Sequence, residues 1–149
     1  MRKIFLAILM VLVVMGNMTV SFAAAGYKDV NKRTIDSKSI KSIKTLKKAG
    51  AFKGVIKGKK FRPNSKMTRR QYLRMLKNLY PGRVTVTEAD KKKAKKMVTE
   101  YYVTQKMVKV AESYGITITW DGSKKKLSRA SVANYVVSFA EFDSAFAIN

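Results

Sequence analysis

Apolar and polar residues alternate at helical spacing in one stretch near the middle of the chain. A helix is expected to open after Thr68, a hydroxyl N-cap that forms a capping box with Gln71 three residues later. Met67, directly before the cap, can pack on Tyr72 as a hydrophobic staple. The apolar face of this helix would consist of Tyr72, Leu73, Leu76, Leu79 and Tyr80. Pro81-Gly82 then ends the helix.

The same pattern returns sixty residues later. Leu127-Ser128-Arg129 repeats Met67-Thr68-Arg69, which is an apolar residue, a hydroxyl cap and an arginine in the first helical turn. The apolar face that follows is Val132, Ala133, Val136, Phe139 and Ala140. An arginine at this end opposes the helix dipole, which favours acidic residues there. Its recurrence indicates a role other than helix stability.

Two further stretches have helical periodicity. The first runs from a cap at Asp36 or Ser37 to Gly50, with apolar positions at Ile40, Ile43, Leu46 and Ala49. The second opens at the cap Thr87 and keeps helical phase to about Ser113, either as one helix or as two interrupted at Val103-Thr104. The last helix is expected to reach about Phe142, with a loose tail after it.

One short segment has a different period. Ile116 to Trp120 alternates like a short strand, and Asp121-Gly122 would turn it. The pattern as a whole therefore predicts a mainly α protein: two helix–loop–helix repeats packed as one small helical body, with room for a short strand or hairpin.

The first repeat resembles a known module. Phe61-Arg62-Pro63-Asn64 followed by Met67-Thr68-Arg69 is similar to the second half of an S-layer homology (SLH) module, which carries an F-x-P-x-x-x-[IM]-T-R-A-E stretch. Such modules begin with an aromatic-x-Asp-Val start, which Tyr27-Lys28-Asp29-Val30 supplies. Ala49-Gly50-Ala51-Phe52 matches the middle. The resemblance covers about residues 27–80.

A second, more diverged copy covers about residues 101–141. The resemblance implies two SLH-like repeats, at 26–83 and 101–149, joined by a linker helix at 84–100. SLH modules usually pack in threes, and the sequence comparison finds two copies. A three-module groove cannot close within two copies, so either a diverged two-copy body binds the polymer or copies from another chain complete the groove. The glutamate of the T-R-A-E motif is absent, since Gln71 and Ser131 stand in its place.

The first twenty-five residues read as a signal peptide. Met1-Arg2-Lys3 is basic, Ile4 to Met15 is an apolar run too short for a membrane span, and Ser21 to Ala25 offers small residues for cleavage. The alternative is an uncleaved anchor helix reaching Val20. Cleavage predicts a secreted protein at the wall surface of a Gram-positive bacterium, with no transmembrane span in the mature chain.

Charge points to an anionic partner. The chain carries 32 Lys and Arg residues against 9 acidic ones, a net charge of +23. Residues 26–83 hold nineteen of these cations and two acids. A field of this size favours anionic wall polysaccharide or anionic lipid headgroups. Nucleic acid is disfavoured as a partner because an exported protein does not meet it.

Composition also excludes several chemistries. The chain has no cysteine and no histidine, so a thiol nucleophile, a Ser-His-Asp triad and a zinc site built on either residue are ruled out. A glycosidase needs two carboxylates facing across a cleft, and the spacing of the acids suggests no such pair. We expect a non-catalytic protein without a cofactor or a metal.

Candidate binding residues cluster around the first arginine helix. The turn at Lys57, Lys59 and Lys60 would join Arg62, Arg69 and Arg70 if the loop folds back on the helix start. Free N–H groups at a helix N-terminus and forked arginine contacts could then hold a phosphate or a pyruvate-ketal carboxylate.

The resemblance assigns the polymer contact to specific arginines. In SLH modules the arginine of the T-R motif contacts the wall polymer, which implies this role for Arg69 and, more weakly, for Arg129. The alternative for Arg69 is an ion pair with Asp29, or simple solvation. Trp120 is the one tryptophan, and it is either a packing anchor or a sugar-stacking platform.

The sequence thus predicts an exported, non-catalytic envelope protein that attaches non-covalently to an anionic secondary wall polymer. Another SLH-bearing surface protein, or a second copy of this chain, is a further expected partner. The competing hypothesis is a non-specific electrostatic binder of anionic membrane or nucleic acid, in which the SLH-like scaffold only displays lysines.

Overall fold

The computed structural model describes residues 26–140, and within them the chain is mainly α, as predicted. The helices are α2 (Ser37–Lys48), α3 (Arg69–Leu79), α4 (Glu88–Lys92), α5 (Glu100–Glu112) and α6 (Arg129–Ala140). The predicted signal peptide and the predicted end of the last helix and tail, residues 1–25 and 141–149, lie outside the described residues.

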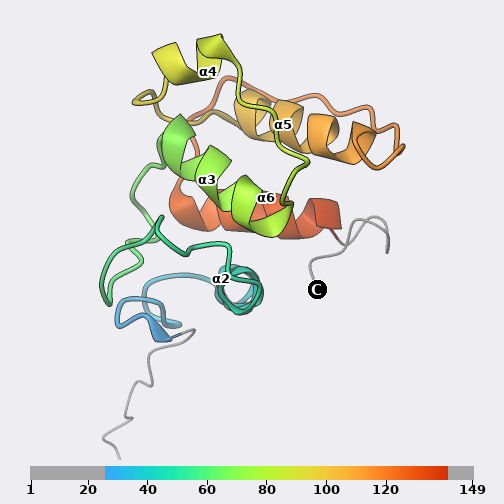
Figure 1. The fold of residues 1–149 in the computed structure, drawn as a ribbon. Coiled ribbons are helices and arrows are strands. Elements are labelled where there is room, and N and C mark those ends of the chain that lie inside the picture. Colours follow the sequence, from blue (N-terminus) through green and yellow to red (C-terminus); the bar gives the residue numbers. More distant parts are fainter. Residues whose placement is uncertain (1–25, 141–149) are drawn as a thin grey trace, which may run out of the picture.

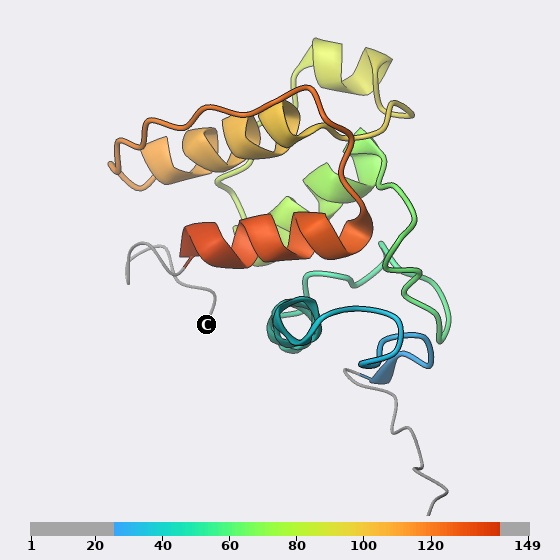
Figure 2. The same ribbon diagram turned by 180° about the vertical axis from the view of Figure 1, so that it is seen from behind.

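The helices form one small body. α6 packs against α2 on one side and against α5 on the other. In Figures 1 and 2, α3, α5 and α6 lie in the plane of the view while α2 is seen end-on, so α2 crosses the other three. α3, α5 and α6 all begin on the same side of the molecule. This shared side positions the candidate site.

The predicted local signals of α2 and α3 are confirmed. Asp36 caps α2, accepting a hydrogen bond from the Ser39 N–H, and Gly50 follows the helix in the left-handed conformation. Thr68 and Gln71 form the predicted capping box of α3. The predicted apolar faces are mostly buried, and the staple residues Met67 and Tyr72 are fully buried in the same core.

The helix expected from Thr87 to Ser113 is two helices, and the predicted place of the break was wrong. Thr87 caps α4, which ends at Lys92, and α5 begins after the cap Thr99, so Val103-Thr104 lies inside α5. The break falls at residues 93–98, whose backbone groups pair with the start of α3 instead of continuing the helix. Helical phase alone does not reveal such a tertiary pairing.

The short strand expected at Ile116 to Trp120 does not form. The segment is irregular, and the pairing found among the described residues consists of three isolated antiparallel bridges located elsewhere. Alternation gives a strand only where a neighbouring strand completes the ladder, and none lies beside this segment.

The three bridges join the segments that lead into α3, α5 and α6. They pair Lys66 with Ser128, Thr68 with Met97, and Thr99 with Lys126. Each bridge joins the cap residue of one helix to the residue two before the cap of the next, and the third bridge returns to the first helix. The three helix starts therefore form a closed ring.

The ring includes a helix start that the two-copy comparison did not contain. Val98-Thr99-Glu100 stands where Met67-Thr68-Arg69 and Leu127-Ser128-Arg129 stand in the other two. Val98 is fully buried like the other staple residues, and Thr99 accepts a hydrogen bond from the Tyr102 N–H. The sequence comparison identified two equivalent helix starts, whereas the structure has three. The third start has a glutamate where the other two have an arginine, so the comparison did not recognise it.

Candidate functional site

Each helix start faces the segment that leads into the next one in the ring, and hollows lie at the starts of α3 and α6. The first-turn residue is Arg69 in α3, Glu100 in α5 and Arg129 in α6. We name the two hollows the Arg69 groove and the Arg129 groove, and we name the start of α5 the Glu100 junction. One backbone arrangement therefore presents three different side-chain environments.

The predicted use of free N–H groups at the start of α3 as an anion site is wrong, and the starts of α5 and α6 are arranged in the same way. The Arg69 and Arg70 N–H groups donate to the carbonyls of Lys96 and Ala94, at 2.9 and 3.0 Å. The equivalent N–H groups of α5 donate to the Lys125 and Ser123 carbonyls, and those of α6 to Ser65 and Pro63. These donors hold the ring together, so any anion must be bound by side chains.

The Arg129 groove gathers most of the predicted cationic residues. It is a hollow of about 350 Å³ whose cationic lining residues are Lys57, Lys59, Lys60, Arg62 and Arg129. No carboxylate lines it, and none of its five cations forms an ion pair within residues 26–140. The backbone of the turn that carries Lys57, Lys59 and Lys60 is held in place, because the Lys28 N–H donates to the Lys59 carbonyl at 2.9 Å.

Arg62 has an unusual backbone conformation at the edge of this groove. Its φ of 57° is left-handed, although a residue before proline usually adopts an extended conformation. Asp29 explains how this conformation is kept: its carboxylate accepts hydrogen bonds from the Phe61 and Arg62 N–H groups at 2.8 and 2.7 Å. These two hydrogen bonds engage Asp29, which is the acid that was considered as a partner for Arg69.

Arg129 is the most buried cation of its groove. Its Nη1 donates to the Phe61 carbonyl at 2.8 Å, while its Nε is buried without a hydrogen-bond partner among the described residues. Burial and the nearby Arg62 guanidinium lower the pKa of Arg129, and Asp29 acts in the opposite direction. The guanidinium stays charged at neutral pH, so a bound anion would relieve an unfavourable positive field.

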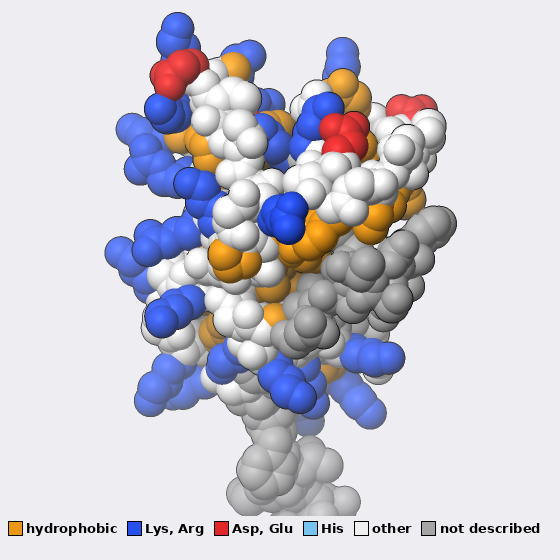
Figure 3. All heavy atoms as spheres, turned by 45° about the vertical axis from the view of Figure 1, so that its right-hand side comes forward, with side chains coloured by type: hydrophobic (Ala, Val, Ile, Leu, Met, Phe, Trp, Pro, Cys, Tyr) orange, Lys and Arg blue, Asp and Glu red, His pale blue; other side chains and the backbone are white. Residues whose placement is uncertain are grey.

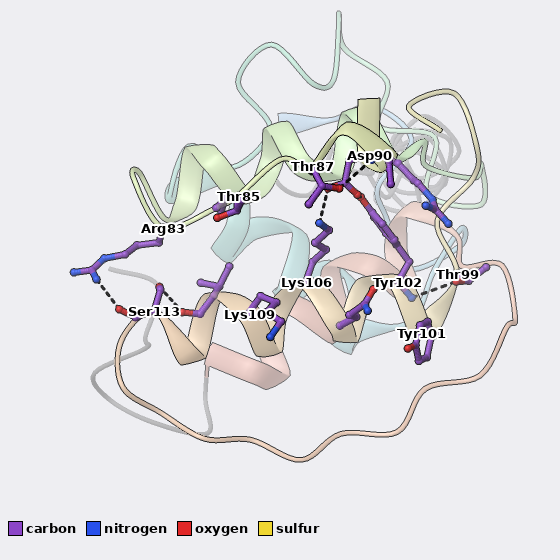
Figure 4. Close-up of a pocket in the computed structure, with 15 residues that line it drawn as sticks. Arg83, Thr85, Thr87, Asp90, Thr99, Tyr101, Tyr102, Lys106, Lys109 and Ser113 are labelled. Atoms are coloured by element: carbon purple, nitrogen blue, oxygen red, sulfur yellow. Dashed lines mark hydrogen bonds and ion pairs between the residues drawn. The ribbon is translucent and has the colours of Figure 1, made fainter. Parts of the chain in front are cut away.

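The Arg69 groove is larger, about 540 Å³, but its charges are matched within the protein. The Arg69 guanidinium stacks on the Tyr102 ring at 4.1 Å from the ring centroid. Lys106 reaches up from α5 to Asp90, with 2.6 Å between Nζ and Oδ2 (Figure 4). Arg83 donates to the Ser113 carbonyl. Its fourth cation, Lys109, pairs with Glu112 at 2.7 Å.

Asp90 is the centre of the Arg69 groove. Asp90 is 4% exposed. Its carboxylate accepts hydrogen bonds from Lys106, from the Tyr102 hydroxyl at 2.7 Å, and from the N–H and hydroxyl of Thr87. Burial raises the pKa of Asp90, but these hydrogen bonds together lower it well below its usual range. Burial and the bond to Asp90 raise the pKa of Tyr102.

At the Glu100 junction the first-turn side chain is engaged by neighbouring hydroxyl groups. The Glu100 carboxylate accepts hydrogen bonds from the Ser123 and Tyr135 hydroxyls. The bond from Ser123, followed by the bond from Tyr135, lowers the pKa of Glu100. The pKa of Tyr135 is raised to about 12, mainly by its hydrogen bond to the Glu100 carboxylate and to a smaller extent by burial.

Two predicted site residues lie apart from the others. Arg70 is exposed and lines a shallow hollow with Arg74 and Lys77, away from the Lys57–Lys60 turn. Trp120 is 44% exposed and packs against Phe139, with 4.8 Å between the ring centroids. It is thus partly a packing residue, and its exposed part borders a separate hollow.

No helix within residues 26–140 has both the length and the apolar character needed to cross a membrane. The same residues contain no group of side chains suited to hold a metal ion. Comparison with protein-family models, with curated proteins and with solved structures finds no match for this chain.

Proposed function

We propose that this chain is an exported, non-catalytic protein of the cell envelope, built on an SLH-like plan, that binds an anionic wall polymer in the Arg129 groove. The observation that carries the proposal is the lining of that groove. Five cations from two distant parts of the sequence converge there, and no carboxylate lines the hollow with them.

The contrast with the other cations supports this choice. Many of the chain's lysines are spread over exposed helix faces, where solvation accounts for them. Cations that converge on a hollow without a carboxylate in its lining cost electrostatic energy. A ligand carrying phosphate or carboxylate groups would offset that cost, and Arg129 and Arg62 could add forked contacts that lysine does not make.

The ring of helix starts supports the SLH-like part of the proposal. SLH modules usually occur in threes, pack into one body and bind polymer in the grooves between modules. Three equivalent starts within one chain satisfy that plan without a partner chain. The grooves differ in role, however, and the Arg129 groove ranks above the Arg69 groove, which the sequence favoured.

The test is a pull-down on purified wall sacculi, before and after the secondary polymer is stripped. Arg129→Ala and Arg62→Ala should each weaken binding to intact sacculi about tenfold or more, because each removes a charge-assisted contact. Arg129→Lys should weaken it too if the contact is forked. Stripped sacculi should bind little of any variant.

Lys44→Ala is the matched control, since Lys44 is an exposed lysine of α2 outside the groove. Arg69→Ala separates the two arginine grooves, and we expect it to bind almost as well as wild type. Unfolding curves establish that each variant is folded. Equal losses for Arg129→Ala and Lys44→Ala would mean diffuse charge attraction, as would heparin or DNA competing as well as the polymer at equal charge.

A further inference from the structure

The ring of helix starts has an outer end that the grooves do not use. In each of the three lead-in segments, the residue just before the cap is buried: Met67, Val98 and Leu127. Side chains alternate along an extended backbone. The residue two before each cap therefore points outward, and these residues are Lys66, Met97 and Lys126, all exposed. The bridges bring the three segments together around one axis.

Lysines surround this outward-facing trio. We call the resulting surface the ring face, and its members are Lys66, Lys95, Lys96, Met97, Lys124, Lys125 and Lys126, all exposed. None of its lysines forms an ion pair within the described part of the chain. In Figure 3, Lys and Arg side chains are numerous along the left edge of the molecule.

Acidic groups do little to offset this charge. Glu100 is the carboxylate nearest to Lys125, and it is already engaged by the Ser123 and Tyr135 hydroxyls. Asp121, exposed beyond the third segment, is the other acid on this part of the chain. The lead-in residues 93–97 and 123–127 contain no acid.

The chemistry of the ring face differs from that of the Arg129 groove. It contains no arginine, and the methionine that lies among its lysines, Met97, is 40% exposed. Long lysine stems can keep their ammonium groups at headgroup level while an apolar side chain enters the lipid boundary. A soluble polyanion would leave Met97 in water, whereas a bilayer would bury it.

We propose that the ring face is a docking surface for an anionic phospholipid bilayer, with Met97 at the point of closest approach. This inference is independent of the groove, since the two surfaces share no residue. It gives the chain a defined orientation at a membrane surface, which diffuse attraction through a net charge of +23 would not produce.

The first test reads orientation with a single fluorescent label. The chain has no cysteine, so Met97→Cys and, as a control on α2, Lys44→Cys each carry one environment-sensitive dye. Both are full-length chains, so residues 1–25 contribute equally to binding. Vesicles of phosphatidylglycerol and phosphatidylcholine should shift the dye at position 97 to the blue and leave the dye at 44 unchanged.

The second test compares matched charge variants. Lys95→Gln/Lys96→Gln/Lys126→Gln removes three charges from the ring face, and Lys38→Gln/Lys41→Gln/Lys44→Gln removes three exposed charges from α2. The measured quantity is binding to anionic vesicles divided by binding to pure phosphatidylcholine vesicles. About 1 kcal/mol per lysine at the surface predicts roughly a hundredfold fall in this ratio for the first variant. The second should fall less than about tenfold, because screening weakens distant charges.

Three results would overturn the inference. One is a dye at position 44 that shifts as much as the dye at 97. Another is an equal fall in the vesicle ratio for both triple variants. The third is an equal blue shift at position 97 with soluble poly(glycerol phosphate) and no lipid, which would make the ring face a polymer surface instead.

Discussion

Two arginines occupy the same position in the fold and have opposite surroundings. Arg69 and Arg129 both follow a hydroxyl cap, and both have a buried Nε without a hydrogen-bond partner among the described residues. Around Arg69, every cation of the groove has a partner in the protein: a tyrosine ring, a carboxylate or a carbonyl. Around Arg129, five cations share one hollow that has no carboxylate in its lining, and none of them forms an ion pair within the described residues, although Arg129 donates to the Phe61 carbonyl.

This difference teaches that the position of an arginine in a motif does not decide its role. The backbone ring fixes where each first-turn residue lies, and the neighbours decide whether its charge is matched. A matched groove stabilises the fold, whereas an unmatched groove can bind an anion. Substitutions in and around the two grooves test this difference.

The largest effect is expected from Asp90→Ala, which breaks the matched groove. Lys106 has a side chain only 12% exposed and would lose its counter-charge, and Tyr102 would lose its hydrogen-bond acceptor. Removing one partner of such a buried pair costs about 3–5 kcal/mol of unfolding free energy. Urea denaturation measures the loss. Glu112→Ala removes the exposed pair with Lys109 and should cost less than about 1 kcal/mol; equal costs would contradict the contrast.

The next effect concerns what the two grooves share. Met67→Ala and Leu127→Ala should each lower the unfolding free energy by about 2–5 kcal/mol, because both side chains are buried under their helix starts. Lys126→Ala, one residue from Leu127 but exposed, should change it by less than about 0.5 kcal/mol. Thermal unfolding compares the three variants. A cost for Lys126→Ala as large as that for Leu127→Ala would mean that the ring does not alternate as described.

A smaller effect is a pH dependence that belongs to the matched groove alone. The pKa of Asp90 is lower in the folded chain than in the unfolded one. Its contribution is therefore complete above the unfolded value of about 4 and is lost as the pH falls below it. Unfolding free energies measured from pH 6 downward should decline, and Asp90→Asn should decline less steeply. Identical slopes for wild type and variant would show that other carboxylates dominate.

The smallest effect is expected at the start of α5, where Glu100 lies. Glu100→Gln removes the charge that raises the pKa of Tyr135 to about 12, so this tyrosine should ionise closer to the ordinary value of about 10. Since the folded pKa is raised, the stability contributed by Tyr135 is present below pH 10 and is lost as the pH rises through 12. Ultraviolet titration, with Tyr135→Phe to assign the signal, measures the shift. An unchanged titration would mean that burial alone holds Tyr135.

Much of the local structure could be predicted from the sequence, because caps and apolar faces act over a few residues. Asp36, Thr68 and Thr87 are caps as expected, and the face of α6 is buried as its spacing indicated. The break before α5 could not be predicted in the same way. It depends on Ala94 and Lys96 accepting hydrogen bonds from a helix that begins some twenty-five residues earlier.

The site was partly predictable for the same reason. The turn at Lys57–Lys60 and Arg62 are close in sequence, and they do lie together. Arg129 joins them, and Arg69 and Arg70 do not, because the ring places the start of α6 beside the segment that leads into α3. The staple-and-cap pattern at Val98-Thr99 was a usable signal for the third start, which the search for a following arginine passed over.

The sequence by itself determined the helices, their caps, the excess of positive charge and the residue that follows each cap, since these depend on neighbours along the chain. Only the tertiary structure decided which cations meet and which are matched. The first N–H groups of each helix donate to carbonyls of the segment that leads into the next helix of the ring, so the ring closes in one way. That closure sets Arg69 on Tyr102 and Arg129 among four other cations.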